Sequence, residues 1–204
     1  PNLGECWAQR TATFMILGEH CTRSCGFCKV LTGRGAVLDP LEPWNVAQAV
    51  RRLELRHAVI TSVTRDDLKD GGSAHFAATI RAVHQLNTHT SVEVLIPDFK
   101  GETGPLQTVL EAGPEVLAHN IETVERLQRR VRPQGRFDRS LEVLRRAKEL
   151  RPDVLTKSSI MLGLGETAEE VRRAMVAVRE QGVDFFTIGQ YLRPSKEHLP
   201  VERF

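Results

Sequence analysis

Short apolar runs alternate with longer amphipathic stretches along the whole chain. Six of these runs have the length of strands and are bounded by glycine, proline or polar residues, which is typical of buried strands. The predicted strands are Thr11–Leu17, Ala58–Val63, Ser91–Ile96, Val116–Ile121, Leu155–Leu162 and Phe185–Tyr191. Between them the apolar positions change to helical spacing.

Apolar residues in the intervening stretches line single faces of helices. Val46, Val50 and Leu53 fall at positions i, i+4 and i+7. The same spacing predicts helices over Phe76–Val83, Val124–Val131, Leu141–Ala147 and Val171–Val178. Thr167 precedes the last of these, and Glu170 three residues later completes the sequence pattern of a capping box. Gly182 is expected to end that helix.

This alternation predicts an α/β fold with a parallel sheet, because parallel neighbours need crossover connections instead of tight turns. Two architectures fit: an open doubly wound sheet, or a whole or partial (β/α) barrel. In both, the chemistry lies beyond the C-terminal ends of the strands. The loops that follow the predicted strands are therefore the place to look for a site, and they are rich in glycine and polar residues.

Composition describes one globular domain over residues 1–204. The 28 Lys and Arg nearly balance the 26 Asp and Glu, so no basic face for nucleic acid is expected. No apolar run approaches the ~18 residues of a membrane span. The start at Pro1 resembles neither a signal peptide nor a transit peptide. We therefore expect a protein without a membrane partner in a reducing compartment.

Three of the four cysteines, Cys21, Cys25 and Cys28, form a C-x3-C-x2-C motif just after the first predicted strand. Thiolates this close converge on one centre with little loop-closure cost. A disulfide framework is disfavoured in a chain of this size without a secretory signal. Zinc, with Cys6 or His20 as the fourth ligand, and an iron–sulfur cluster both fit the spacing.

The position of the motif favours the iron–sulfur cluster. A structural zinc knuckle has no preferred place in a fold, whereas this motif falls at the catalytic end of a parallel β/α architecture. Three thiolates also leave one iron of a cubane cluster without a protein ligand. An open coordination position is how metal centres hold substrate, so we expect a [4Fe–4S] cluster that chelates a small molecule.

The chain resembles a known family at this point. The cysteine motif, with Phe27 just before its third cysteine, resembles the signature of radical S-adenosylmethionine (SAM) enzymes, and within them the lipoyl synthase family. The segments that carry the resemblance are Pro1–Trp7, Ala12–Gly18, Val59–Leu68, Asp70–Gly72, Val92–Leu95, Pro97–Phe99, His119–Val124, Val131–Pro133, Thr156–Ser158, Gly163–Thr167, Thr187–Leu192 and His198–Val201. Each is weak alone, but their order and spacing are specific.

The resemblance implies a partial (β/α)6 barrel of the radical SAM type. Cys21, Cys25 and Cys28 would ligate a [4Fe–4S] cluster that binds SAM, and one electron would cleave SAM to methionine and a 5′-deoxyadenosyl radical. The radical would abstract hydrogen from C6 and C8 of an octanoyl chain on a carrier lysine, where two sulfur atoms are inserted. The enzyme class implied is a radical SAM sulfurtransferase.

Family members take the sulfur from a second, auxiliary [4Fe–4S] cluster, held by a C-x4-C-x5-C motif and a serine near the C-terminus. Here Cys6 matches the last cysteine of that motif, which makes residues 1–10 a remnant of the auxiliary-cluster segment. Its two partners would precede Pro1, and the chain stops at Phe204 before the serine. We expect a trimmed stretch of a longer lipoyl synthase, capable of SAM cleavage but impaired in double sulfur insertion.

The resemblance also suggests contacts to SAM, each with a plainer alternative. Thr61, Ser62 and Asp66 belong to a loop that would grip the SAM amine, and Asp67 is a second acceptor; the alternative is a solvated turn or N-cap. Asn120 and Glu122 would bind ribose or methionine, or simply cap a helix. Gly163 belongs to a pattern near adenine, with departures at Ser159 and Met161. Lys157 and Arg193 are candidate carboxylate clamps.

The partners implied are octanoylated lipoyl-carrier domains, of 2-oxoacid dehydrogenase E2 subunits or of the glycine cleavage H protein, and a ferredoxin or flavodoxin reductant. A monomer is expected, in the cytoplasm or, in a eukaryote, in a mitochondrion or plastid. Two alternatives remain: a radical SAM enzyme with another substrate, and a zinc-stabilised binding module. Five of the seven histidines are expected on the surface or on helices, and His20 and His119, which lie beside site residues, are expected to be structural.

Overall fold

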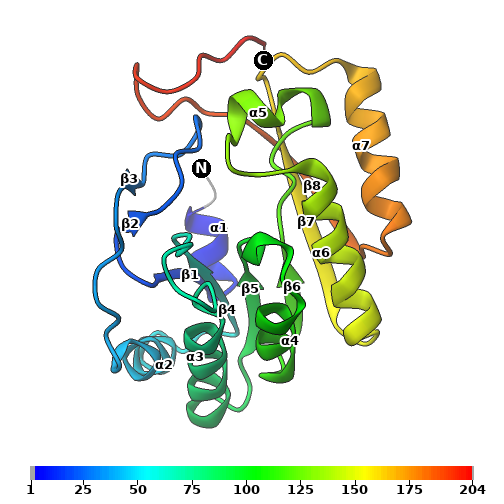
Figure 1. Ribbon diagram of the computed structural model, residues 1–204. Helices are drawn as coiled ribbons and strands as arrows, with labels where there is room; N and C mark the ends of the chain where they lie inside the picture. Colours follow the sequence, from blue (N-terminus) through cyan, green and yellow to red (C-terminus); the bar gives the residue numbers. More distant parts are fainter. Residues whose placement is uncertain (1–2, 204) are drawn as a thin grey trace.

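The computed structural model describes residues 3–203 and has a six-stranded parallel sheet (Figure 1). The strands are β1 (Thr11–Ile16), β4 (His57–Ser62), β5 (Ser91–Leu95), β6 (Val116–Ala118), β7 (Leu155–Leu162) and β8 (Phe185–Gln190). They are ordered β1-β4-β5-β6-β7-β8, and every neighbouring pair is parallel. Strands β1 and β8 form the two edges of this sheet, which makes it an open, partial (β/α)6 barrel, as predicted.

The helices form the outer layer of the fold. They are α1 (Leu3–Ala8), α2 (Glu42–Arg52), α3 (Ser73–Leu86), α4 (Thr103–Glu111), α5 (Gln128–Val131), α6 (Phe137–Leu150) and α7 (Ala168–Glu180), with one-turn 3₁₀ helices at Phe99–Gly101 and Glu125–Leu127. Two short strands, β2 (His20–Cys21) and β3 (Leu31–Thr32), pair separately. Within residues 3–203, none of the helices has both the length and the apolar character that crossing a membrane requires.

The predicted strands are confirmed to within about one residue, except at β6, which ends at Ala118 instead of Ile121. The chain leaves the sheet there and returns at Glu122, whose N–H donates to the carbonyl of Ser159 (3.1 Å). Helix α4 was not predicted, although its buried Leu106, Val109 and Leu110 have helical spacing. The single helix predicted over Val124–Val131 is divided into a 3₁₀ turn and α5.

One face of the sheet packs against the helices. Alternate strand residues such as Ile60, Val94 and Leu117 are completely buried there. Burying a side chain of this size contributes about 1.5–3 kcal/mol. Two clusters result, one under α2, α3 and α4 and the other between β7, α5 and α7. The loops that follow the strands lie at the C-terminal ends of the strands, where a site can form.

Replacing Thr167 with alanine is expected to destabilise α7. The Thr167 side chain accepts a hydrogen bond from the Glu170 N–H (3.2 Å), and the Glu170 carboxylate accepts one from the Thr167 N–H (2.8 Å), which confirms the predicted capping box. Thr167→Ala should lower the free energy of unfolding by about 1 kcal/mol in urea titrations. Thr108→Ala inside α4 is the control, since alanine suits a helix interior. A capping role for Thr167 requires the larger loss to be at that position.

Candidate functional site

The three clustered cysteines lie in one loop above the C-terminal end of the sheet. We call residues 21–28 the cysteine loop. The chain leaves β1 through Leu17 and Gly18, which both have positive φ angles (71° and 92°), and this turn directs it over the strand ends. Cys21 belongs to the short strand β2, and the chain returns through β3. The local sequence thus places the thiols where parallel β/α folds keep their sites.

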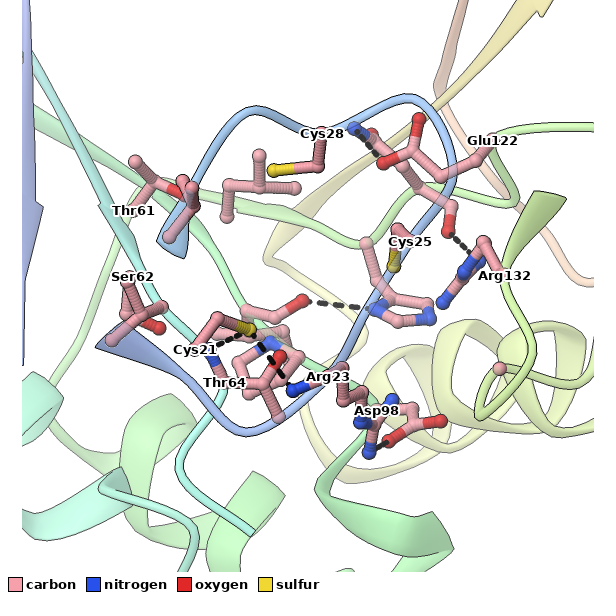
Figure 2. A pocket seen from close by; sticks show the side chains of 18 of the residues that line it. Cys21, Arg23, Cys25, Cys28, Thr61, Ser62, Thr64, Asp98, Glu122 and Arg132 are labelled. Atoms are coloured by element: carbon pink, nitrogen blue, oxygen red, sulfur yellow. Dashed lines mark hydrogen bonds and ion pairs between the residues drawn. The ribbon is translucent and has the colours of Figure 1, made fainter. Parts of the chain in front are cut away.

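The cysteine loop forms one wall of a cavity of about 280 Å³. Figure 2 shows Cys21, Cys25 and Cys28 around a common space, between Thr61 and Ser62 on one side and Glu122 and Arg132 on the other. Eight of the predicted site residues line it: Cys21, Cys25, Phe27, Cys28, Thr61, Ser62, Asn120 and Glu122. Further lining residues that were not assigned to the site include Arg23, Thr64, Asp98 and Arg132.

All three thiols of the loop are free of disulfides. Burial raises the pKa of the Cys25 thiol to about 11, against the opposing effect of the Arg132 charge. Among residues 3–203, no three His, Cys, Asp or Glu side chains converge closely enough to hold one metal ion. The three thiols border one cavity, which brings them to a common space.

The wall opposite the cysteines carries an amide, a carboxylate and a guanidinium. Glu122 adopts a positive φ of 62°, and burial raises the pKa of its carboxyl above the usual value. The Asn120 amide donates to Glu122 (3.2 Å). Arg132 is buried and donates through Nη1 to the carbonyls of Asn120 (2.9 Å) and Ile121 (3.2 Å). This wall can bind a molecule that has both hydrogen-bonding groups and a negative charge.

Ser62 presents a polar atom that lacks a protein partner. Its Oγ is buried and has no hydrogen bond within the described part of the chain, although Ser62 lines the cavity. An unpaired buried hydroxyl costs free energy unless a ligand or water satisfies it. Ser62 at the end of β4 is therefore suited to bind a polar group of a ligand.

Comparisons with known proteins agree with this geometry. Residues 15–178 match the family model of the Radical SAM superfamily. The chain is 62% identical over its whole length to a lipoyl synthase of Rubrobacter xylanophilus, of which it covers 64%. It is 57% identical, again over its whole length, to a lipoyl synthase of Flavobacterium johnsoniae, of which it covers 70%. The chain belongs to the lipoyl synthase family.

The chain thus spans about two thirds of the length of the lipoyl synthases that it matches. Its fold is also similar to the crystal structure of methylornithine synthase, with a TM-score of 0.72 at 17% sequence identity; the match covers 95% of this chain and 56% of that one. At so low an identity the likeness concerns the fold alone. It agrees with the partial barrel described above.

Asp66 and Asp67 face arginines in this member of the lipoyl synthase family. The Asp66 carboxylate accepts from Nε and Nη2 of Arg23 (2.8 and 3.0 Å), and Asp67 accepts from Nε and Nη2 of Arg65 (2.8 and 2.9 Å). Neither carboxylate lines the cavity. The C-terminal end of β4 therefore faces the cavity with Thr61 and Ser62, and the loop after it does so with Thr64. The acidic residues of that loop pair with arginines instead.

The two predicted carboxylate clamps lie outside the cavity. Lys157 on β7 pairs with Glu93 on β5 (2.9 Å), so the strand lysine is compensated by a carboxylate two strands away in the sheet. Arg193 is exposed and donates to the carbonyl of His198 (2.9 Å). Arg132 is instead the guanidinium in the cavity wall, and the sequence marked it only as part of the family segment Val131–Pro133.

Gly163 and Cys6 are also separate from the cavity lining. Gly163 has a φ of 107°, and a Cβ there would lie 2.6 Å from the Arg203 carbonyl, so glycine is required for close packing of the C-terminal segment. Cys6 lies on α1, away from the cysteine loop in sequence and outside the cavity it forms. His20, at the start of β2, does not line the cavity either.

His119 should make the folded protein less stable in mild acid. His119 lines the cavity but is buried, with Nδ1 2.9 Å from the Ile96 carbonyl and Nε2 3.0 Å from Ser140 Oγ, so both ring nitrogens have protein partners, as expected of a structural histidine. Burial, assisted by Arg132, lowers the pKa of His119 to about 4. Its contribution to stability is therefore complete above the unfolded-state pKa near 6.5 and falls as the pH is lowered toward 4.

The expected loss between pH 7.5 and 5.5 is about 1 kcal/mol from this residue. Urea unfolding at the two pH values, for the wild type and for His119→Gln, measures it. The variant should lose less stability over this interval than the wild type, because glutamine does not titrate. Equal losses in both proteins would assign the pH dependence to other groups.

Proposed function

We propose that this chain is the catalytic barrel of a lipoyl synthase, a radical SAM sulfurtransferase that inserts sulfur at C6 and C8 of a protein-bound octanoyl-lysine. The observation that carries the proposal is the meeting of Cys21, Cys25 and Cys28 in one cavity at the C-terminal end of the sheet. High identity to lipoyl synthases supplies the substrate and the reaction.

The cysteine loop fits a [4Fe–4S] cluster. Its three free thiols line one cavity, and two backbone N–H groups, of Arg23 and Thr64, donate to Cys21 Sγ (3.4 and 3.3 Å). Donors of this kind stabilise the negative charge on cluster sulfurs. Cys21, Cys25 and Cys28 would hold the cluster, and its fourth iron would be open to SAM.

The remaining walls fit SAM. The Arg132 guanidinium would attract the methionine carboxylate, since a fork of N–H donors suits that group. The Asn120 amide and the Glu122 carboxyl would bind ribose hydroxyls or the amine, and Ser62 Oγ would gain its missing partner. Phe27 and Thr61 would line the same space. Asp66, Lys157, Gly163 and Arg193 would act indirectly, through the loops and strands that they hold.

Held by Cys21, Cys25 and Cys28, a [4Fe–4S] cluster would pass one electron from the external reductant to SAM, which is the chemistry that yields methionine and a 5′-deoxyadenosyl radical. The chain's own contribution is to hold SAM still and to keep water away. Met15, Val63 and Leu95 give the cavity an apolar lining between its polar groups. This apolar lining would help to exclude water from the reacting groups, which is what a protein must provide for such a cofactor.

Further components follow from the family. Cys6 on α1 would be one ligand of the auxiliary [4Fe–4S] cluster that supplies sulfur. The protein substrates would be octanoylated lipoyl domains of 2-oxoacid dehydrogenase E2 subunits or the glycine cleavage H protein. A ferredoxin or flavodoxin would supply electrons, and the protein would act as a monomer in the cytoplasm. Residues 1–204 would form one radical SAM domain.

The test uses anaerobically reconstituted protein, dithionite and SAM, with an octanoyl-lysyl peptide deuterated at C6 and C8. We expect about four iron and four acid-labile sulfide for the barrel cluster, release of 5′-deoxyadenosine, and deuterium in that product. Release without deuterium transfer would point to a radical SAM enzyme with another substrate. Zinc near one per chain without sulfide would replace the cluster by a zinc-stabilised binding module.

A further inference from the structure

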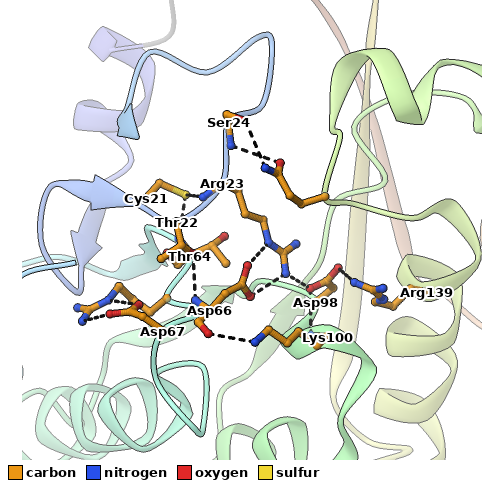
Figure 3. A network of polar contacts seen from close by, with 12 residues as sticks. Cys21, Thr22, Arg23, Ser24, Thr64, Asp66, Asp67, Asp98, Lys100 and Arg139 are labelled. Atoms are coloured by element: carbon orange, nitrogen blue, oxygen red, sulfur yellow. Dashed lines mark hydrogen bonds and ion pairs between the residues drawn. The ribbon is translucent and has the colours of Figure 1, made fainter. Parts of the chain in front are cut away.

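Arg23, inside the cysteine loop, is held by two carboxylates from two different strand ends (Figure 3). Its Nε and Nη2 donate to Asp66 after β4 (2.8 and 3.0 Å), and Nη2 also donates to Asp98 after β5 (2.6 Å). The Arg23 side chain is 6% exposed and that of Asp98 is 0% exposed. A fork of donors that binds two separate carboxylates holds one loop against two others at the same time.

Asp98 is itself fixed from two further directions. Its Oδ1 accepts from the Lys100 N–H (3.1 Å), and its Oδ2 accepts from Nη1 of Arg139 on α6 (3.1 Å). Lys100 Nζ also donates to the Asp66 carbonyl (3.0 Å). Burial opposes the ionisation of Asp98, yet the hydrogen bonds from Arg23 keep the pKa of the Asp98 carboxyl below its usual range. Burial likewise opposes the charge on Arg23, yet the carboxylates of Asp66 and Asp98 keep the pKa of its guanidinium above the usual value. The network therefore joins the cysteine loop to the loops after β4 and β5 and to α6.

The same loops meet at the sulfur of Cys21. The backbone N–H groups of Arg23 and Thr64 donate to Cys21 Sγ, from the two loops that the Arg23–Asp66 pair joins. Thr22 adds three bonds between these loops: its N–H and Oγ1 donate to the Thr64 carbonyl, and its Oγ1 accepts from the Asp66 N–H. Among residues 3–203, no such bonds reach the sulfurs of Cys25 and Cys28.

We infer that Arg23 is a positioning residue that holds the two N–H donors on Cys21 Sγ. The Cys21 thiol would therefore already be in its final position before any cluster is bound. This inference rests on the proposed role of Cys21 as a cluster ligand. Because hydrogen bonds to cluster sulfurs raise the reduction potential, Arg23 would also raise the potential of the bound cluster. Cys25 and Cys28 would be the ligands that adjust during cluster loading.

The first measurement uses cluster-free, reduced protein and does not depend on any activity. Alkylation of each cysteine by iodoacetamide is followed by mass spectrometry in the wild type, Arg23→Gln and Arg23→Lys. In Arg23→Gln we expect Cys21 to react about tenfold faster through local opening, while Cys25 and Cys28 change by less than about twofold. Arg23→Lys should lie between, because lysine keeps the charge but loses the fork.

Arg139→Gln is the matched control. Arg139 donates to the other oxygen of Asp98, and none of its hydrogen bonds reaches the cysteine loop within the described residues. It should leave the alkylation rate of Cys21 within about twofold of the wild type. A general loosening of the fold would instead raise the rates of all three cysteines in Arg23→Gln, and that result would overturn the inference. Unchanged Cys21 reactivity in Arg23→Gln would overturn it as well.

The second measurement is the reduction potential of the reconstituted cluster. In Arg23→Gln the two backbone N–H groups should no longer be held on Cys21 Sγ. The weaker hydrogen bonds should lower the equilibrium constant for one-electron reduction of the cluster about tenfold, which corresponds to about 59 mV. An unchanged potential in Arg23→Gln would overturn the claim on the potential. If the wild type takes up no cluster, the proposed function fails, while the alkylation rates still decide whether Arg23 positions Cys21. If Arg23→Gln does not fold, Arg23→Lys and Asp66→Asn provide the same comparison.

Discussion

Cys25→Ala is expected to abolish release of 5′-deoxyadenosine from SAM. Cys25 lies in the cavity wall with its two companion cysteines, and the fourth cysteine of the described chain, Cys6, does not line the cavity and so is not placed to replace it. Loss of a direct ligand should exceed the roughly 10–100-fold loss that follows changes in outer partners of a metal site. Product release measured by chromatography under anaerobic conditions, together with iron content, gives the result.

Cys6→Ala is the matched control, because it removes a thiol of the same kind that does not line the cavity. It should retain SAM cleavage within about threefold of the wild type, since the three proposed ligands of the SAM-binding cluster are unchanged. Equal losses in the two variants would contradict the division between a SAM-binding cluster and a separate role for Cys6. Retained cleavage in Cys25→Ala would remove Cys25 from the ligand set.

Asp98→Asn is expected to cause the largest loss of stability among single changes at the site. Asp98 is completely buried and pairs with both Arg23 and Arg139, so asparagine leaves two guanidinium groups with one carboxylate fewer. Breaking a buried pair on one side costs about 3–5 kcal/mol, and we expect the lower end because Asp66 still pairs with Arg23. Urea unfolding of the reduced, cluster-free protein measures the difference.

Asp138→Asn tests whether burial is the reason. Asp138 also pairs with an arginine, Arg136, but both side chains are more than 60% exposed. Exposed pairs contribute about 0–1 kcal/mol, so this variant should remain near the wild type in its free energy of unfolding.

The comparison of Asp98 with Asp138 is made at neutral pH. The pKa of Asp98 lies below its usual range, so the contribution of Asp98 to stability is complete at neutral pH and is lost only when the pH falls through that lowered pKa. Similar losses at Asp98 and Asp138 would mean that burial of the network contributes little.

Hydrophobic periodicity identified the strands well because buried and partly exposed positions alternate along them. In β4 and β7 the buried positions alternate with inner-face positions such as Thr61 and Lys157, and the predicted bounds lie within one residue of those observed. The capping residues of α7 were readable for a similar reason, since the interaction lies within four consecutive residues. Local signals of this kind need no knowledge of distant contacts.

The two arginines of the site were harder to predict. Arg23 lies within the cysteine motif and Arg132 within a family segment, but nothing local says where a long side chain points. Their partners are far away in the chain: Asp98 follows Arg23 by 75 residues. Asp66 was difficult to place for the same reason. The sequence predicts that its carboxylate accepts a hydrogen bond from SAM, whereas the fold pairs that carboxylate with Arg23.

The sequence by itself determined the alternation of strands and helices, the clustering of three cysteines after the first strand and the family. These properties depend on spacing along the chain, and spacing is what hydrophobic periodicity and short motifs record. The tertiary structure decided which charges are paired and which face the cavity. A charge finds its partner only when the fold brings together residues that are distant in sequence, so Arg132 became part of the cavity wall while Lys157 on β7 was compensated by Glu93 on β5.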